Sequence, residues 1–281
     1  MKRVLICLLV IVLPFVANGQ GASSLLIPTN NRSLAMGGVS LQPGPSPLDA
    51  GVSYGIWAPG TASNTVIAAD ALVRIGKKLA ITFEGKDFMD KPYVVSGEQG
   101  AAQGSFTPGE LILSLGGYYD IIGGLSAGLK LKYVNSAIAK DVKGNAFCGD
   151  VEVSYGAKSW SVTLAGRNIG TKIDYSGKAY AIPAYVAAGG QWAPIEGLTV
   201  AAEADYLFSG AIMAGLGAEY SYKDLVFARA GYHYGDAEKA LPGFGSLGLG
   251  AKLAGIRLDA SWLFASKTIS NSFLVSLGYS F

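Results

Sequence analysis

The chain has 281 residues, of which half are hydrophobic and only 15% are charged. If an expected leader over residues 1–19 is removed, Lys2 and Arg3 go with it, and the 22 basic residues fall to 20, equal to the 20 acidic ones. A net charge near zero argues against nucleic-acid binding. One histidine and one remaining cysteine, Cys148, exclude an internal disulfide and give no Cys/His metal site, so no cofactor is predicted.

The first residues have the order of a secretory signal peptide. Lys2 and Arg3 precede an apolar run over residues 4–16, and small and polar residues follow at 17–20. The run is shorter than the roughly 20 residues that a spanning helix needs. We therefore predict a signal peptide over 1–19, with a retained membrane anchor as the alternative.

The region before residue 108 is less regular. Residues 20–50, with Pro43, Pro45 and Pro47, are predicted to form an N-terminal segment that serves as a plug or as a first strand. Strands are expected at 51–57, 64–75 and 77–85, and a long loop at 86–107.

From about residue 108 the chain divides into alternating segments of about ten residues, the length of a barrel strand. In 125–134, Leu, Ala, Leu, Leu and Tyr share one face, while Ser, Gly, Lys and Lys share the other. Short turns alternate with longer polar connections such as 135–145 and 170–182, as in outer-membrane barrels. We predict an all-β fold: a transmembrane antiparallel β-barrel of about 14 strands over 51–281. A soluble β-sandwich also alternates, but aromatic residues near the segment ends favour a barrel with interfacial girdles.

The last segment carries a predicted assembly signal. Five apolar residues share one face of the final strand, and the last of them ends the chain: Phe273, Val275, Leu277, Tyr279 and Phe281. Such an ending resembles the signal of bacterial outer-membrane proteins, whose open strand edge can be bound by strand addition. The expected partners are outer-membrane lipid and the barrel assembly machinery, and the expected location is the outer membrane.

Assigning the apolar face to lipid places the charged residues of 125–265 in the lumen. The candidate lumen-lining residues are Lys130, Lys132, Asp150, Glu152, Arg167, Glu203, Asp205, Glu219, Arg229, Lys252, Arg257 and Asp259. Six cations against six anions predict mutual pairing, which favours structural braces over an ion-selective pore. A polar permeation path or a partner site is the functional alternative. There is no Ser/His/Asp arrangement, so no enzyme is predicted.

Several short motifs resemble the PorV/PorQ family of outer-membrane barrels. They are residues 25–28 with 32–38, residues 103–110, residues 128–134, and residues 167–170 with 182–183. The resemblance implies a barrel similar to the long-chain fatty-acid transporter class in Bacteroidetes-type bacteria. It also implies a role in type IX secretion, with the translocon or its cargo as partners. Residues 57–60 depart from the family's Asn-Pro-Ala type turn.

Two functions are compatible with these observations, and a passive structural barrel is the third possibility if neither holds. The first prediction is an accessory barrel of type IX protein secretion that acts by protein contact. The second is a channel for small hydrophobic molecules, by analogy with fatty-acid transporters. The second ranks lower because such a tunnel should be apolar, whereas the predicted inner face is charged.

Overall fold

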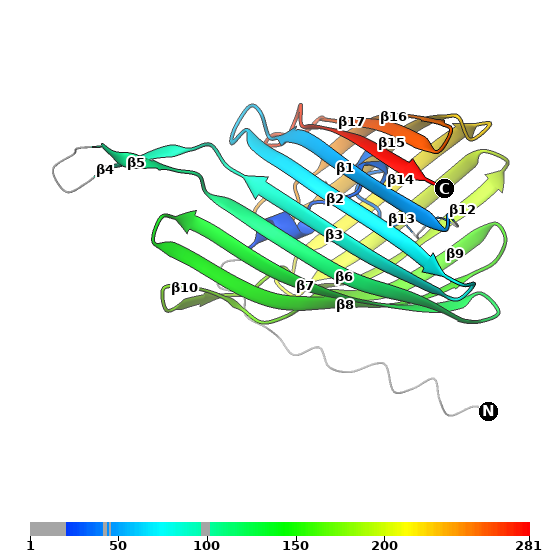
Figure 1. Ribbon diagram of the computed structural model, residues 1–281, viewed down its shortest axis with the longest axis horizontal. Coiled ribbons are helices and arrows are strands. Elements are labelled where there is room, and N and C mark those ends of the chain that lie inside the picture. The colour runs from blue at the N-terminus through cyan, green and yellow to red at the C-terminus, as the bar shows by residue number, and fades with distance from the viewer. Residues whose placement is uncertain (1–20, 42–43, 45, 97–101) are drawn as a thin grey trace, which may run out of the picture.

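Fourteen antiparallel strands form a closed barrel, which confirms the predicted fold (Figure 1). The computed structural model describes residues 21–41, 44, 46–96 and 102–281, with only the backbone at 102 and 103. The predicted signal peptide lies outside the described residues. The barrel strands are β1 Leu48–Trp57, β2 Asn64–Ile75, β3 Leu79–Met89, β6 Gly109–Ile122, β7 Leu125–Ala139, β8 Val142–Gly156, β9 Trp160–Gly170, β12 Tyr185–Ile195, β13 Leu198–Leu207, β14 Ile212–Tyr222, β15 Val226–Gly235, β16 Phe244–Leu253, β17 Ile256–Phe264 and β18 Phe273–Ser280.

The first and last strands close the barrel. Asp49 of β1 lies opposite Ser280 of β18, and the register continues to Ile56 opposite Phe273. Beyond the ladder, the Phe281 N–H donates to the carbonyl of Leu48 at 2.9 Å. Each barrel strand thus has a hydrogen-bonded neighbour on both sides, as a strand surrounded by lipid requires.

The two ends of the barrel differ. One end, here called the turn end, has connections of two or three residues at 76–78, 123–124, 157–159, 196–197, 223–225 and 254–255. The opposite loop end carries most of the longer connections. Two of these contain hairpins, β4 Tyr93–Ser96 with β5 Ala102–Phe106 and β10 Ile173–Tyr175 with β11 Lys178–Tyr180. The β4–β5 hairpin projects well beyond the barrel (Figure 1).

Two predicted connections are largely strand. The expected loop at 86–107 contains the end of β3 and the β4–β5 hairpin, and most of 135–145 belongs to β7 and β8. In both places the ladder continues where the apolar alternation weakens. A strand beyond the lipid has no apolar face to maintain, so hydrophobic periodicity does not reveal it.

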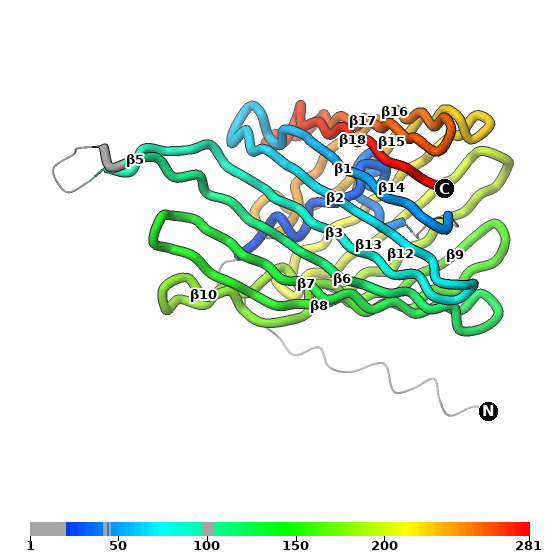
Figure 2. The backbone as a smooth tube through the Cα atoms, viewed as in Figure 1, coloured from blue at the N-terminus to red at the C-terminus, as the bar shows by residue number. Residues whose placement is uncertain are grey.

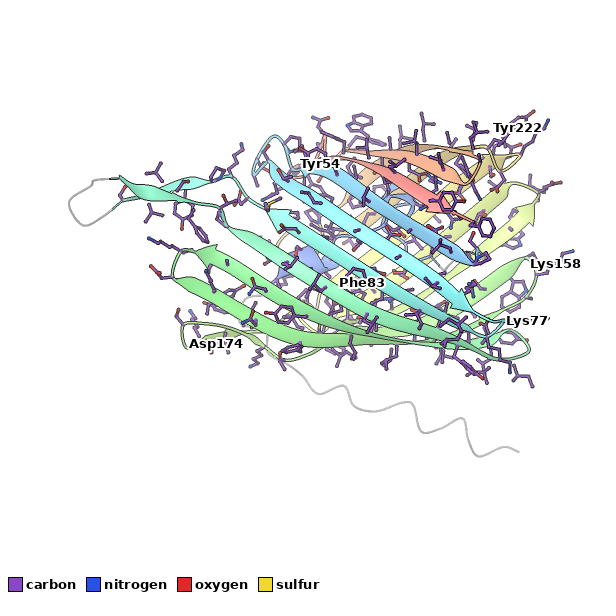
Figure 3. All side chains as sticks on the ribbon, viewed as in Figure 1. Tyr54, Lys77, Phe83, Lys158, Asp174 and Tyr222 are labelled. Atoms are coloured by element: carbon purple, nitrogen blue, oxygen red, sulfur yellow. The ribbon has the colours of Figure 1, made fainter. Side chains whose placement is uncertain are left out.

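The outer face is apolar, as lipid contact requires. Large side chains such as Tyr54, Phe83 and Tyr222 point away from the barrel (Figure 3), and about half of each is exposed. Each alternates with small or polar inward neighbours. No helix in the described part of the chain is long and apolar enough to span a membrane.

Of the predicted N-terminal segment 20–50, residues 21–41 lie inside the barrel, and we call them the plug, whereas its last residues, 48–50, belong to the first strand (Figure 2). It contains η1 Ser23–Leu26 and α1 Asn31–Ala35, and the first strand begins only at Leu48. The Asn30 side chain caps α1 by accepting hydrogen bonds from the backbone N–H groups of Arg32 and Ser33. The helix lies against β15 to β18.

Candidate functional site: the barrel lumen

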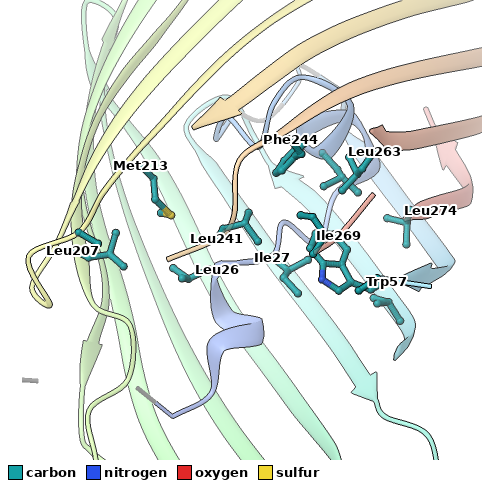
Figure 4. Close-up of a cluster of buried hydrophobic side chains, with 14 residues drawn as sticks. Leu26, Ile27, Trp57, Leu207, Met213, Leu241, Phe244, Leu263, Ile269 and Leu274 are labelled. Atoms are coloured by element: carbon teal, nitrogen blue, oxygen red, sulfur yellow. The ribbon is translucent and has the colours of Figure 1, made fainter. Parts of the chain in front are cut away.

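The lumen is apolar at the loop end. Inward residues near that end of the strands pack with the plug and with the loops that fold over it (Figure 4). We call this cluster the apolar zone, and its buried members are Leu26, Ile27, Leu34, Trp57, Ala58, Val66, Leu207, Ala211, Met213, Leu241, Phe244, Leu263, Ile269 and Leu274. Leu207, Phe244 and Leu263 are completely buried. The zone is therefore filled by the protein's own side chains.

A second apolar cluster adjoins the start of the plug. It joins Ala22 to inward residues of β6, β7 and β8, including Ile112, Val134 and the free thiol of Cys148. The β10–β11 hairpin covers it through Ile173 and through Tyr175, whose hydroxyl donates to Ser136 Oγ at 2.7 Å.

Toward the turn end, the lumen holds a cavity of about 540 Å³ with a charged lining. The plug borders it on one side. We call its charged wall residues the charged zone: Asp49, Asp70, Glu84, Lys130, Lys132, Asp150, Glu152, Arg167, Glu219, Asp224, Arg229, Lys252, Arg257 and Asp259. Ten of these are residues that the alternation predicted to line the lumen: Lys130, Lys132, Asp150, Glu152, Arg167, Glu219, Arg229, Lys252, Arg257 and Asp259.

Arg229 on β15 is the centre of one ion-pair chain. Its Nε lies 2.6 Å from Glu219 Oε2 and its Nη1 lies 2.5 Å from Asp259 Oδ1. Arg257 extends the chain from Asp259 at 3.0 Å to Asp49 at 2.8 Å. Because all of these side chains are mostly buried, the pairing offsets the cost of removing the charges from water.

Asp150 on β8 is the centre of the second chain. It lies 2.7 Å from Lys132 Nζ and 3.7 Å from Arg167, which also pairs with Glu152 at 3.2 Å. A bulge in β9 places Asn168 beside them, with a φ of 54° that asparagine tolerates better than most residues. Its N–H donates to Asp150 at 2.8 Å, and its side-chain oxygen accepts from Lys132 at 2.7 Å.

The other predicted lumen residues have different partners. Lys130 pairs with Glu84 of β3 at 2.6 Å, although Asp150 is its direct cross-strand neighbour. Lys252 lies 3.4 Å from Asp224 at the turn end. Glu203 accepts hydrogen bonds from the N–H and hydroxyl of Ser40. Buried Asp205 Oδ1 has no hydrogen-bond partner among the described residues.

Polar side chains of the wall hold the plug. Lys86 of β3 is fully enclosed and donates to the carbonyls of Ser24 and Ile27, both at 2.6 Å. Arg32 binds Glu219 with two hydrogen bonds of 2.9 and 2.7 Å. The Asn31 side chain donates to the Leu274 carbonyl at 3.0 Å. The Ser246 hydroxyl donates to the Ala35 carbonyl at 2.9 Å and accepts from the Gly37 N–H at 3.1 Å. His233 Nδ1 lies 3.1 Å from the Gly37 carbonyl.

Glycines in the wall make room for the backbone after α1. A Cβ at Gly217 would overlap the Met36 carbonyl oxygen, and one at Gly231 would overlap the Gly37 nitrogen. Gly37 itself has a φ of 75°, in the region that favours glycine. Met36 is completely buried in this cradle. The inward glycines of β14 and β15 thus have a packing role that strand alternation does not suggest.

Several of these residues were not among the sequence predictions. The predicted lumen residues lie within 125–265, so Asp49, Asp70 and Glu84 are not among them, and Lys86 lies in the predicted loop at 86–107. The alternation Phe83, Glu84, Gly85, Lys86 was the available signal, because it continues the pattern of β3.

The residues of the predicted assembly signal lie on the outer face of β18 and at its end. Phe273, Val275, Leu277 and Tyr279 are each between 41% and 51% exposed, and Phe281 is 75% exposed. Leu274, between two of them, is buried in the apolar zone. Their role in assembly stays a prediction.

No group of three or more His, Cys, Asp or Glu side chains that could hold a metal ion occurs among the residues that the structure describes. The lumen combines an apolar zone at the loop end with a charged zone toward the turn end, in which Glu219 binds Arg32 of the plug.

The fold is similar to solved outer-membrane channels, whereas no protein-family model and no curated protein sequence matches the chain. The CymD monoaromatic hydrocarbon channel has a TM-score of 0.63 and 15% identity, covering 91% of this chain and 98% of that one. The toluene transporter TbuX of Ralstonia pickettii gives 0.64 and 12%, covering 89% and 98%. TodX, the toluene transporter of Pseudomonas putida, gives 0.54 and 13%, covering 94% and 95%.

At these identities the likeness concerns the fold. The barrel fold implied by the sequence resemblance agrees with the fold of these neighbours. The narrower PorV/PorQ assignment rests on the short motifs alone. One of them, residues 32–38, is accounted for by the seating of the plug in the glycine cradle.

Proposed function

We propose that this chain is an outer-membrane channel for small hydrophobic molecules. The observation that carries the proposal is the division of the lumen, with a buried apolar zone at the loop end. The solved barrels of similar fold include channels for toluene and other monoaromatic hydrocarbons. This supports the second sequence prediction over the first.

The charged inner face, which argued against a hydrophobic channel, lies mainly in a different part of the lumen. The apolar zone contains no ion pair among its described members. A ligand of a few apolar carbons would gain roughly 25 cal/mol for each Å² of surface buried there. Because Leu26 and Ile27 occupy the zone, a ligand must displace this part of the plug.

Trp57 provides a direct test of binding. It is 7% exposed within the apolar zone, whereas Trp160, Trp192 and Trp262 are exposed on the outer face. Toluene added to the purified full-length protein in detergent should change the emission of Trp57. The variant Trp57→Phe should lose that response.

A matched pair of variants locates the site. Met213→Gln keeps the side-chain length but introduces a buried amide into the apolar zone, so it should weaken toluene binding by about tenfold or more, since an unpaired buried polar group costs about 1–3 kcal/mol. Ser221→Gln, on the same strand at the turn end, should leave binding unchanged. No toluene-dependent emission change, together with no toluene flux into proteoliposomes above empty liposomes, would reject the proposal.

Type IX secretion by protein contact remains the alternative, supported by the sequence resemblance. The β4–β5 hairpin, which projects from the loop end, is the feature that a protein partner could reach (Figure 1). Deleting the gene should then reduce surface delivery of secreted cargo. Unchanged delivery and no co-purifying translocon component would exclude this role.

A further inference from the structure

Exposed lysines gather on one side of the loop end. Lys140 and Lys143 lie at the β7–β8 connection, and Lys172 and Lys178 lie in the connection that contains the β10–β11 hairpin. We call these four residues the lysine group. All four are exposed, and none forms an ion pair with any residue that the structure describes. Only Asp141 and Asp174 accompany them, and Asp174 accepts the Gly177 N–H at 2.7 Å.

The two connections are held together. A Cβ at Gly144 of β8 would lie 2.9 Å from Ile173 Cγ1 and would overlap the Asp174 carbonyl, so β10 rests directly on β8. Asp174 marks this end of the barrel in Figure 3, opposite Lys77 and Lys158 at the turn end. The lysine group therefore belongs to a single sector over β8, in which cations outnumber anions by four to two.

The outer face of β8 gives the position of this sector along the barrel axis relative to the apolar band. Its outward residues run from Tyr155 at the turn end to Phe147, a span of about 26 Å along the strand and about 20 Å along the barrel axis after the usual tilt. Phe147 packs against Tyr133 with the ring centroids 5.2 Å apart and the ring planes tilted by 47°. The next outward residue, Asn145, accepts a hydrogen bond from the Tyr133 hydroxyl at 2.8 Å. The apolar band ends here.

The lysines lie just beyond this boundary. Lys143 follows Asn145 on the same face of β8, about 7 Å further along the strand. Lys172 follows Thr171, whose N–H donates to the Phe147 carbonyl at 2.8 Å. Lys143 and Lys172 are thus at the height of lipid headgroups, next to the aromatic residues that mark the interface. Lys178 lies on the β10–β11 hairpin above them, with its Nζ 5.4 Å from the centre of the Tyr180 ring.

The rest of the loop end lacks this excess. The other described connections there carry three acids and three lysines: Asp90, Lys91, Asp236, Glu238, Lys239 and Lys267. An uneven cluster of unpaired lysines at headgroup height is the electrostatic arrangement that binds anionic lipid. In outer-membrane barrels the longer loops face the cell exterior.

We propose that the lysine group binds the phosphate groups of lipopolysaccharide in the outer leaflet. A bound glycolipid would lie along β7 and β8, with its acyl chains against the apolar outer face and its phosphates among the four ammonium groups. The site is independent of the lumen and of the channel function.

The test uses the full chain in a nonionic detergent, with bisphosphorylated lipid A as the probe. Apparent affinity is measured by native mass spectrometry of the bound lipid. Each lysine close to an anionic lipid contributes roughly a fivefold change in affinity. The variant K140Q/K143Q/K172Q/K178Q should therefore bind lipid A about twentyfold or more weakly. The control K91Q/K239Q/K267Q should change affinity by less than about twofold, since it removes almost as many lysines from the same end.

Enzymatic removal of both phosphates from lipid A should weaken binding to the natural chain as much as the fourfold variant does. Equal affinity of the natural chain and the fourfold variant would overturn the proposal, and so would equal affinity for the dephosphorylated lipid. Binding of polyglutamate by the lysine group without binding of lipid A would also overturn it, in favour of an acidic protein partner. If the fourfold variant does not fold, K140Q/K143Q and K172Q/K178Q are tested separately, each with an expected loss of about fivefold or more.

Discussion

Replacing Gly217 with valine should loosen the plug without opening the lumen. Gly217 faces inward on β14, where a Cβ would overlap the Met36 carbonyl oxygen and lie 2.5 Å from Met36 Cβ. Contacts below 3.0 Å with backbone cannot be relieved by a rotamer change, so the chain after α1 must shift. Overpacking of this kind costs about 1–3 kcal/mol. Because the obstructing atoms are mostly backbone, we expect a value near the upper limit.

The attachments of the plug exceed that cost. Buried Leu34 and Met36 contribute roughly 2 kcal/mol each. The bonds to Ser246 contribute about 1 kcal/mol each, and the two-bond Arg32–Glu219 pair adds about 2 kcal/mol, since Arg32 is only partly exposed. The total of about 8 kcal/mol is larger than the strain, so the plug should remain seated in most molecules.

Hydrogen exchange measures this difference. A loss of 2–3 kcal/mol should speed exchange of the backbone amides at 34–38 by roughly 30- to 150-fold, while exchange of the barrel strands stays the same. Gly85→Val is the matched control, because Gly85 faces outward on β3 and meets only Leu113 Cδ2, at 3.6 Å. A change below about threefold in a folded Gly217→Val barrel would refute the seating of the plug in the glycine cradle. Increased passage of polar solutes would refute the estimate that its attachments outweigh the strain.

Three further substitutions test other parts of the fold. Arg229→Leu leaves its two buried carboxylate partners short of a cation and should lower the free energy of unfolding by about 3–5 kcal/mol, measured by denaturant titration. Adding Glu219→Gln should restore part of that loss, and no recovery would contradict the assignment. Lys86→Met leaves the buried Ile27 carbonyl without the lysine donor, whereas the Ser24 carbonyl keeps the Ile27 N–H at 3.1 Å. Since an unsatisfied buried carbonyl costs about 1–3 kcal/mol, the variant should speed amide exchange at 24–27 by about thirtyfold, and unchanged exchange would show that the lysine does not hold η1. Phe281→Asp should lower the amount of protein inserted in the outer membrane, measured in membrane fractions, and normal levels would undo the assembly assignment.

Strand number and the choice of inner and outer face could be predicted because both follow from local pattern. A barrel strand shows lipid every second residue, so the alternation around Leu129 or Val151 indicates the exposed face without knowledge of its neighbours. The height of a residue within the lumen could not be predicted from local alternation, because it depends on the register between strands. Leu207 and Leu263 are inward and apolar, and only the register shows that they meet at one end.

The ion-pair partners could not be predicted for a related reason. Lys130 and Asp150 are direct neighbours across the β7–β8 ladder, which favours a pair between them. In the folded barrel, Lys132 and Arg167 surround Asp150, and the bulge at Asn168 adds a hydrogen bond, so Lys130 turns to Glu84. A bulge changes the direction of a side chain, and a prediction that assumes strict alternation along the strand does not allow for it.

The plug reconciles a charged lumen with the hydrophobic ligand that we propose. Its helix is two-sided: Leu34 packs into the apolar zone, whereas Arg32 and Asn31 bond to the wall near Glu219 and Asp259. An apolar plug in an apolar barrel would gain packing energy in many orientations, because hydrophobic contact is non-directional. Paired charges and directed hydrogen bonds select one orientation, since a buried charge without its partner is costly. The Arg32–Glu219 pair is therefore evidence about how the plug is held, while most other charges of the zone pair with one another in the wall. The chemistry of the proposed ligand has to be inferred from the apolar residues that the plug covers.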